Sequence, residues 1–432
     1  MSGKSMKIDV HHVTRIEGHG NIEVDIDNGE VKKIEWQVPE APRFFEAMVI
    51  GRGCEQVAPI TARICGICSI GHTFASLKAT ENAMDIKISE QTAKLRELLL
   101  HGETLQSHIL HVCYLVVPDL FRVNSVIPLA HTHKDVILLV TKLHRLANEL
   151  CDVIGGRTTH PIRTCIGGFT KLPEKKELVE LKQRLIDSVD GLKQLVEVVK
   201  TVAGGLPNFT RETEYISLKD TADYAFYDGT IKSSDLENPI PITDYLKVTN
   251  EYVSPQSTAK WAKFNREAYF AGALARYNNN YQQLTDLSRQ VGASLGLDGV
   301  SYNPFMNNVA QIVECVFAVE RSIAIIDWLL DNMKPEVASF EKKAGRGVGA
   351  VEVPRGILFH EYSYDDEGKC LKANCVIPTN QNHANIQLDV EKLVDEFKHE
   401  GKDELQFKLE MLVRAYDPCV SCSTHFLDVK FV

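Results

Sequence analysis

Two Cys-x-x-Cys pairs lie almost at opposite ends of this chain. The first is Cys65 and Cys68, and the second is Cys419 and Cys422. Four thiolates form a complete ligand set for a soft or borderline metal ion. Pairs so distant in the sequence can share one metal only if the chain folds back on itself. We therefore expect one cooperative unit in which the two ends of the chain meet.

The composition is that of a globular protein, and it narrows the function classes. The chain is 44% hydrophobic and 25% charged, and its net charge of −10 argues against nucleic-acid binding. Its 11 cysteines lack regular spacing, which makes a poor disulfide framework and fits a reducing compartment. No apolar leader follows Met1, and the apolar stretches 109–121 and 309–330 are interrupted by charged residues. These features predict a cytoplasmic chain with no direct membrane span.

Hydrophobic periodicity predicts a fold class that is mainly α (α+β). Alternating polar and apolar residues over 6–38 predict a small peripheral β-sheet. Helical periodicity predicts a helical core over 70–204 and 257–334, with an irregular or β insertion at 205–256 between them. We expect a large single unit built on a long-helix bundle with small peripheral sheets, in which a metal site joins the N- and C-terminal motifs.

Individual helices follow from the same periodicity. Ser89 is placed to cap a helix that runs through Leu105, and Lys and Glu residues separate the apolar positions of 174–200. Further helices are predicted at 134–154, 257–294, 306–334 and 390–413. The glycine-rich run Gly345–Gly349 lacks the strand–helix context of a nucleotide loop, and we expect a flexible loop there.

A structural zinc site is the simplest interpretation of four cysteines. Structural zinc sites usually keep their ligand pairs within tens of residues, because the metal replaces a small core. A chain of 432 residues does not need that replacement. The flanking residues also favour chemistry, since His72 and His425 follow the two pairs and Asp417 precedes the second.

Three motifs carry a resemblance to a known family. They are Arg15-Ile-Glu-Gly-His19, Arg63-Ile-Cys-Gly-Ile-Cys-Ser-Ile-Gly-His72 and Asp417-Pro-Cys-Val-Ser-Cys-Ser-Thr-His425. Together they resemble the signatures of the large, catalytic subunit of nickel–iron hydrogenases. Val353-Pro-Arg-Gly356 and Val376-Ile-Pro-Thr379 also resemble internal segments of that family, so the resemblance covers residues 1–432 as one large-subunit domain.

The resemblance implies a Ni-Fe(CO)(CN)2 centre held by the four cysteines. Cys65 and Cys419 resemble the terminal nickel ligands, whereas Cys68 and Cys422 resemble the thiolates that bridge nickel and iron. The implied reaction is the reversible heterolytic oxidation of H2 and reduction of protons. The chemistry agrees, because nickel that cycles between redox states favours soft, electron-rich thiolates.

The resemblance also implies catalytic roles outside the cysteines. Glu17 resembles the first proton relay beside Cys419, since a carboxyl group can accept and pass a proton. Arg355 resembles the arginine that lies over the open metal positions, where its permanent charge polarises substrate but makes it a poor base. Asp119 and Asp417 resemble carboxylates that orient Arg355. A helix-capping or exposed aspartate remains the alternative for Asp119.

Further residues resemble contacts of the metal centre. Pro378 and Thr379 resemble residues that contact the diatomic ligands of iron, with the threonine hydroxyl donating to cyanide. His72 is placed to hydrogen-bond a bridging sulfur and tune it. Glu46 and His425 resemble ligands of a second ion, Mg2+ or Fe2+, although a histidine is an unusual ligand for magnesium.

The C-terminal metal-binding motif at 414–425 is followed by a short tail. Residues 426–432 resemble a maturation peptide that a protease removes after His425 once nickel has been inserted. The tail would act as a latch that keeps the metal site open during assembly.

The remaining cysteines show no spacing for an iron–sulfur cluster. The resemblance therefore implies that an iron–sulfur small subunit is the first electron partner. Further redox subunits for NAD(P), ferredoxin, a deazaflavin or a heterodisulfide reductase are implied by the likeness to the soluble cytoplasmic bidirectional groups. The alternative function is a non-catalytic scaffold related to the quinone-module subunit of respiratory complex I, which lacks the full four-cysteine set.

Overall fold

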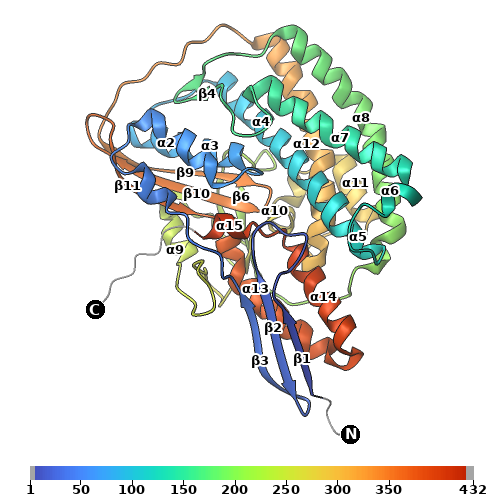
Figure 1. The fold of residues 1–432 in the computed structure, drawn as a ribbon. Helices are drawn as coiled ribbons and strands as arrows, with labels where there is room; N and C mark the ends of the chain where they lie inside the picture. The colour runs from blue at the N-terminus through green and yellow to red at the C-terminus, as the bar shows by residue number, and fades with distance from the viewer. Residues whose placement is uncertain (1–4, 425–432) are drawn as a thin grey trace, which may run out of the picture.

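A bundle of long helices forms the largest part of the molecule in the computed structural model, which describes residues 5–424 (Figure 1). The bundle consists of α4 (Glu90–Ile109), α7 (Lys134–Gly155), α8 (Lys175–Val202) and α12 (Asn307–Asn332). Helix α4 packs against α7 and α12, and α8 packs against the same two helices. The expected mainly α (α+β) fold is confirmed. Within the described residues, no helix combines the length and apolar composition needed to cross a bilayer.

The helix boundaries follow the signals in the sequence. The Ser89 hydroxyl accepts a hydrogen bond from the amide of Thr92 at 3.0 Å and so caps α4 as predicted. Glu174 and Glu177 form a reciprocal capping box at the start of α8. The leucines at 178, 181, 185 and 192 are all buried, because their spacing places them on one face of the helix.

A three-stranded antiparallel sheet lies at the base of the view in Figure 1, beside α13 (Pro378–Phe397) and α14 (Lys402–Ala415). Its strands are β1 (Met6–Val10), β2 (Asn21–Asp27) and β3 (Glu30–Gln37). They fall within the range where a small sheet was expected. The loop between β1 and β2 carries the Arg15–His19 motif toward the middle of the molecule, where α15 (Val420–Ser423) lies.

A second antiparallel sheet forms where a flexible loop was expected. Its strands are β9 (Gly345–Val353), β10 (Gly356–Tyr364) and β11 (Cys370–Val376), in the order β11-β10-β9. A Cβ atom at Gly345, Gly347 or Gly349 would lie only 2.0–2.2 Å from carbonyl oxygens of α3 (Ser69–Ala83). The loop prediction is wrong, because alternate glycines let this strand approach the helix backbone closely.

Two predicted helices are also wrong in their bounds. The range 257–294 contains strand β8 (Tyr269–Phe270) before α10 (Ala273–Asn280) and α11 (Asp286–Ser294), because β8 pairs with β6 (Glu214–Lys219). The range 390–413 contains two helices, since Gly401 separates α13 (Pro378–Phe397) from α14 (Lys402–Ala415).

Short elements complete the described chain. They are α1 (Phe45–Val49), α2 (Cys54–Thr61), a π-helix (Leu110–Val116), α5 (Val117–Leu120), α6 (Leu129–Thr132), β4 (Thr164–Cys165), β5 (Gly168–Phe169), β7 (Thr230–Ser233) and α9 (Tyr245–Thr249). Single 3-10 turns cover Ala62–Ile64, Ala203–Gly205, Ile242–Asp244, Tyr281–Gln283, Pro304–Met306 and Lys398–Glu400.

Candidate metal centre

The four cysteines predicted to share a metal converge in the folded chain. Their Sγ atoms all lie within 4.8 Å of one another, and the Sγ atoms of Cys65 and Cys419 are 3.6 Å apart. All four side chains are buried. We call Cys65 and Cys68 the N-terminal pair, and Cys419 and Cys422 the C-terminal pair. The two ends of the chain therefore meet at a single site of the kind that binds a soft metal.

Local structure positions the N-terminal pair. Cys65 follows the 3-10 turn Ala62–Ile64, and Cys68 is the N-cap residue of α3. The Sγ of Cys65 accepts hydrogen bonds from the amides of Ile67 and Cys68, both at 3.3 Å. Amides directed at a sulfur stabilise the thiolate, which is the form that binds metal.

The four thiols shift one another's pKa. Hydrogen bonds from the other three cysteines, that from Cys419 being the strongest, hold the pKa of Cys65 well below its usual range. Burial raises the pKa of both Cys419 and Cys422, and the hydrogen bond with Cys419 raises the pKa of Cys68. Several thiolates this close together in a buried site need a cation to be ionised at once. This donor set fits a divalent soft metal.

Contacts from distant parts of the chain position the C-terminal pair. The amide of Cys419 donates to the hydroxyl of Thr379 at 3.0 Å. Glu17 pairs with Cys419 as an isolated parallel β-bridge, and the amide of Val420 donates to the Glu17 carbonyl at 2.9 Å. The Glu17 carboxylate accepts from the amide of Ser421 at 3.1 Å. The structure thus places Glu17 directly against the C-terminal pair.

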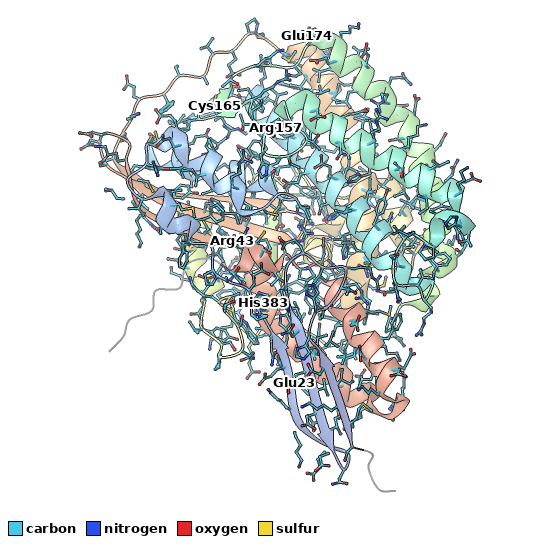
Figure 2. The ribbon with its side chains drawn as sticks, viewed as in Figure 1. Glu23, Arg43, Arg157, Cys165, Glu174 and His383 are labelled. Carbon is cyan, nitrogen blue, oxygen red and sulfur yellow. The ribbon has the colours of Figure 1, made fainter. Side chains whose placement is uncertain are left out.

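Arg43 and His383, labelled in Figure 2, also hold this segment. Arg43 donates to the Ser421 carbonyl through Nη2 and to the Thr424 carbonyl, at 3.1 Å, through its amide. The Nδ1 atom of His383 accepts from the indole N–H of Trp36 at 3.1 Å, so Nε2 carries the proton that faces Ser423 Oγ at 3.0 Å. Burial lowers the pKa of His383 to about 3, which keeps the ring neutral.

Arg355 lies in the tight turn between β9 and β10. Its Nε donates to the Asp417 carbonyl at 2.6 Å and its Nη2 to Asp417 Oδ1 at 2.7 Å. Burial would lower the pKa of Arg355, but Asp417 and the nearby cysteine thiolates outweigh burial and raise it far above its usual range. The Nη1 atom is buried without a hydrogen-bond partner among residues 5–424. A permanent positive charge with an unpartnered Nη1 amino group therefore lies close to the thiol cluster.

The structure corrects the role expected for Asp119. Its carboxylate accepts from Arg414 Nε at 2.7 Å and Nη2 at 3.0 Å, and also from Arg15. Arg355 is held by Asp417 instead, whose second oxygen accepts from Gln311 at 3.0 Å. The prediction that Asp119 orients Arg355 is wrong, because two other guanidinium groups occupy its carboxylate. Asp119 joins the Arg15–His19 motif to the end of α14.

His72 lies on α3 with an unused ring nitrogen. Its Nδ1 lies 3.0 Å from Nε2 of His360, and its buried Nε2 lacks a partner within the described part of the chain. Burial lowers the pKa of His72 to about 4, so the ring is neutral. Buried polar atoms are rarely left without a partner. The free atoms of His72 and Arg355 fit a site that is completed by a bound group.

The remaining predicted site residues are the two expected near iron, Pro378 and Thr379, and the two expected at a second ion, Glu46 and His425. Pro378 and Thr379 are the first residues of α13, beside Cys419. The carboxylate of Glu46, on α1, accepts from the amide of Cys375 at 2.7 Å, and burial raises the pKa of Glu46 to about 7. His425 and the tail 426–432 lie outside the described residues.

Sequence reasoning missed several buried polar residues that surround this site. Gln311 holds Asp417, and Arg276 holds the carbonyls of Val353 and Pro354 at 2.8 and 3.0 Å, which fixes the turn that carries Arg355. One signal was available. Asn307, Gln311 and Glu314 recur at helical spacing in an otherwise apolar helix, α12, and all are buried. A polar stripe inside an apolar helix predicts a buried network.

The fold and the thiol cluster define a metalloenzyme subunit, and comparisons identify its family. A model described as nickel-dependent hydrogenase matches residues 43–138 and 204–425, and one described as HoxL-like matches residues 7–41. The chain belongs to the nickel-dependent hydrogenase family, and it is a catalytic subunit with a four-cysteine site.

Relatives extend over the full chain. The alpha subunit of sulfhydrogenase 1 of Pyrococcus furiosus is 33% identical, with 98% of this chain and 99% of that protein covered. One subunit of the F420-non-reducing hydrogenase of Methanothermobacter marburgensis is 30% identical, with 98% and 95% covered. The crystal structure of an NAD+-reducing NiFe-hydrogenase in the H2-reduced state superimposes with a TM-score of 0.88 at 25% identity, with 98% of this chain and 100% of that chain covered.

Proposed function

We propose that this chain catalyses H2 ⇌ 2H+ + 2e− at a Ni-Fe(CO)(CN)2 centre held by its four cysteines. The convergence of four buried Sγ atoms within 4.8 Å carries the proposal. Cys65 and Cys419 would hold nickel, and Cys68 and Cys422 would bridge it to iron. Pro378 and Thr379 would contact the diatomic ligands of iron. When bound, the centre supplies the redox-active metal that takes the electrons of H2.

Arg355 and Glu17 perform the chain's own part of the reaction. The guanidinium of Arg355, fixed by Asp417, presents a permanent charge and an unpartnered Nη1 amino group at the cluster. It polarises a bound molecule but does not take its proton. Glu17 is the proton acceptor, because it lies against Cys419 and a carboxyl group can pass a proton onward. Cys419 would deliver the proton to Glu17.

Electrons leave through an iron–sulfur small subunit. Arg63 and Gly66, next to the buried N-terminal pair, are exposed, and His160 contacts the Ala62 carbonyl at 3.1 Å. Arg157, three residues before His160, is also exposed (Figure 2). A basic face beside the metal cluster suits a partner that carries an anionic, thiolate-ligated cluster. A relative in Archaeoglobus profundus is itself named an iron-sulfur subunit of an F420-non-reducing hydrogenase.

The final acceptor is set by further subunits. The similar proteins include a sulfhydrogenase, F420-non-reducing hydrogenases and an NAD+-reducing enzyme, so closely related chains serve different acceptors. Subunits for NAD(P), ferredoxin, a deazaflavin or a heterodisulfide reductase are the candidates. All 11 cysteines are free thiols, which suits the reducing cytoplasm. Identification of co-purifying chains tests both points.

The second ion and the tail complete the proposal. Glu46 would bind Mg2+ or Fe2+ together with His425, and removal of residues 426–432 would follow nickel insertion. Arg43 holds the carbonyl of Thr424, so the last described residue is already fixed against the segment that leads to Glu46. Intact mass of the active enzyme checks the cleavage. A competent chain that still ends at Val432 contradicts it and leaves the four-thiolate site untouched.

Metal analysis of the purified complex, combined with infrared spectroscopy, tests the central proposal. We expect nickel with iron in excess of it, because the clusters of the small subunit also contain iron. We also expect absorption bands of CO and CN, and H2-dependent reduction of a viologen dye. Zinc in place of nickel and iron would indicate a structural site. Absence of nickel, zinc and the CO and CN bands, together with quinone binding, would indicate the scaffold function.

A further inference from the structure

The start of α3 is capped from another helix. Cys68 is the N-cap residue of α3, yet its side chain makes no capping hydrogen bond. An N-cap side chain usually accepts from the amide of the second or third helical residue, here Ile70 or Gly71. These amides lie directly after a metal-binding cysteine. Without another acceptor they would be free to donate to its sulfur.

Glu103, on α4, accepts both of these amides. Its Oε2 accepts from the Ile70 amide at 2.7 Å, and the Gly71 amide is shared between Oε1 at 3.1 Å and Oε2 at 3.2 Å. The side chain is 0% exposed and lies on the apolar face of α4 defined by Leu95 and Leu99. A carboxylate at a helix N-terminus is favoured by the helix dipole. A glutamate on a buried helix face was the signal that the sequence offered for it.

The packing leaves no room for this arrangement to change. A Cβ atom on Gly71 would lie 3.0 Å from Glu103 Oε1 and 2.0 Å from Val353 Cγ1. Only glycine allows the helix start, the carboxylate and the strand that leads to Arg355 to meet. Burial raises the pKa of Glu103 in the metal-free chain, as does the Cys65 thiolate, whereas the Ile70 and Gly71 amides and Arg355 lower it and so favour the carboxylate. Glu103 is therefore electrostatically coupled to the cluster as well as to the helix.

Building on the proposed function, we propose that Glu103 is a positioning residue for the metal centre. By binding the Ile70 and Gly71 amides, it keeps them away from Cys68 Sγ, whose electron pairs then remain available to two metals. An N–H···S hydrogen bond would withdraw electron density from that sulfur. Groups beyond the direct ligands set the electron density and potential of a metal site in this way.

The substitution Glu103→Gln tests the proposal in the nickel-loaded complex. Glutamine keeps the shape but replaces one acceptor oxygen with an NH2 group, which cannot accept. An NH2 group in the Oε2 position releases the Ile70 amide toward Cys68, and one in the Oε1 position leaves both amides to a single oxygen and so weakens their bonds. We expect the CO and CN bands to shift to higher wavenumber and the midpoint potential of nickel to rise, with nickel content unchanged. Glu103→Asp, which retains the carboxylate, should restore part of both shifts.

Glu214→Gln is the matched control. Glu214 is also fully buried and accepts a backbone amide, that of Asn265 at 3.1 Å, but it lies on β6 outside the cysteine cluster. Its replacement should lower stability without moving the bands or the potential. Unchanged bands and potential in a fully loaded Glu103→Gln complex would overturn the proposal and leave Glu103 as a helix cap only.

If the Glu103→Gln complex takes up no nickel, a second measurement tests the proposal. Co2+ is titrated into the purified metal-free wild-type and Glu103→Gln chains, and the thiolate-to-cobalt charge-transfer absorbance is compared. A weaker band per bound cobalt in the variant supports the proposal, and equal bands overturn it. A wild-type complex that lacks CO and CN bands would instead contradict the proposed function.

Discussion

The two cysteine pairs of one metal site are held by opposite means. The N-terminal pair is framed chiefly by elements contiguous with it in the sequence, namely α2, a 3-10 turn and α3, to which α4 adds the support of Glu103. The C-terminal pair is framed by residues far from it in the sequence, including Glu17, Arg43 and Thr379. One half of the site therefore depends on local folding, whereas the other half depends on docking of the chain end.

This difference bears on how the site is assembled. Closing a loop that spans nearly the whole chain costs conformational entropy before any contact stabilises it. Local helix and turn contacts carry no comparable cost. We therefore expect the N-terminal pair to be in place first and the C-terminal segment to dock last. A site that closes last remains accessible for metal insertion.

Loss of a thiolate should have the largest effect on nickel content and activity, and the effect should be the same for the N-terminal and C-terminal pairs. Changing Cys65 or Cys419 to Ser replaces a soft ligand with a hard hydroxyl that stays protonated. We expect nickel incorporation or activity to be abolished in both variants. Nickel content and H2-dependent dye reduction are the measurements. A serine variant that keeps both would remove that cysteine from the ligand set.

Glu17→Gln should block proton transfer from the C-terminal pair while leaving the metals bound. The amide keeps an acceptor for Ser421 but cannot take up a proton. We expect net turnover and hydrogen–deuterium exchange with solvent to be blocked, with metal content and para/ortho hydrogen conversion largely retained. Glu40→Gln is the control, because Glu40 accepts from the Ser421 hydroxyl at 3.0 Å on the same segment. Normal turnover in Glu17→Gln would exclude it as the proton relay.

The comparison of the pairs also shows what the sequence could predict. Motif spacing predicted that both pairs share one site, and helical periodicity with capping residues predicted α4, α7, α8 and α12. These features are encoded by neighbouring residues. The contacts of Asp119 could not be predicted, since its partners Arg15 and Arg414 become neighbours only in the folded chain.

The prediction of a flexible loop at 345–349 is wrong for a similar reason. Alternate glycines are typical of a flexible loop when read alone, but here they face the backbone of α3, and a Cβ at Gly349 would lie 2.1 Å from the Ala75 carbonyl. The requirement comes from the partner helix and not from the strand itself. Close packing between distant elements is therefore the part of this fold that local patterns do not specify.

Arg355→Lys should cause the next largest effect. Lysine keeps the charge but loses the planar group that binds Asp417 through two nitrogens. We expect a loss of rate on the order of 10²-fold, typical of a removed electrostatic contact in an active site, with nickel and iron retained. Arg346→Lys is the control, because Arg346 also pairs with a carboxylate on the same sheet, that of Glu361 at 2.8 Å. An Arg355→Lys enzyme without nickel would show that Arg355 serves assembly.

The smallest expected effect is on the rate of nickel loss, and it should distinguish the C-terminal pair from the N-terminal pair most clearly. Asn380 donates to the Ser423 carbonyl and to the Lys260 carbonyl, both at 3.0 Å, so Asn380→Ala leaves buried carbonyls unpaired at a cost of about 1–3 kcal/mol. Asn82→Ala is the counterpart on the other side, because Asn82 joins α3 to the Val348 carbonyl at 2.8 Å. Both variants should unfold at lower temperature, but only Asn380→Ala should lose nickel faster to a chelator. The reason is that the C-terminal pair is held by such long-range contacts, whereas the N-terminal pair keeps its local frame. Equal rates of nickel loss would mean that both pairs rely on the tertiary fold to the same degree.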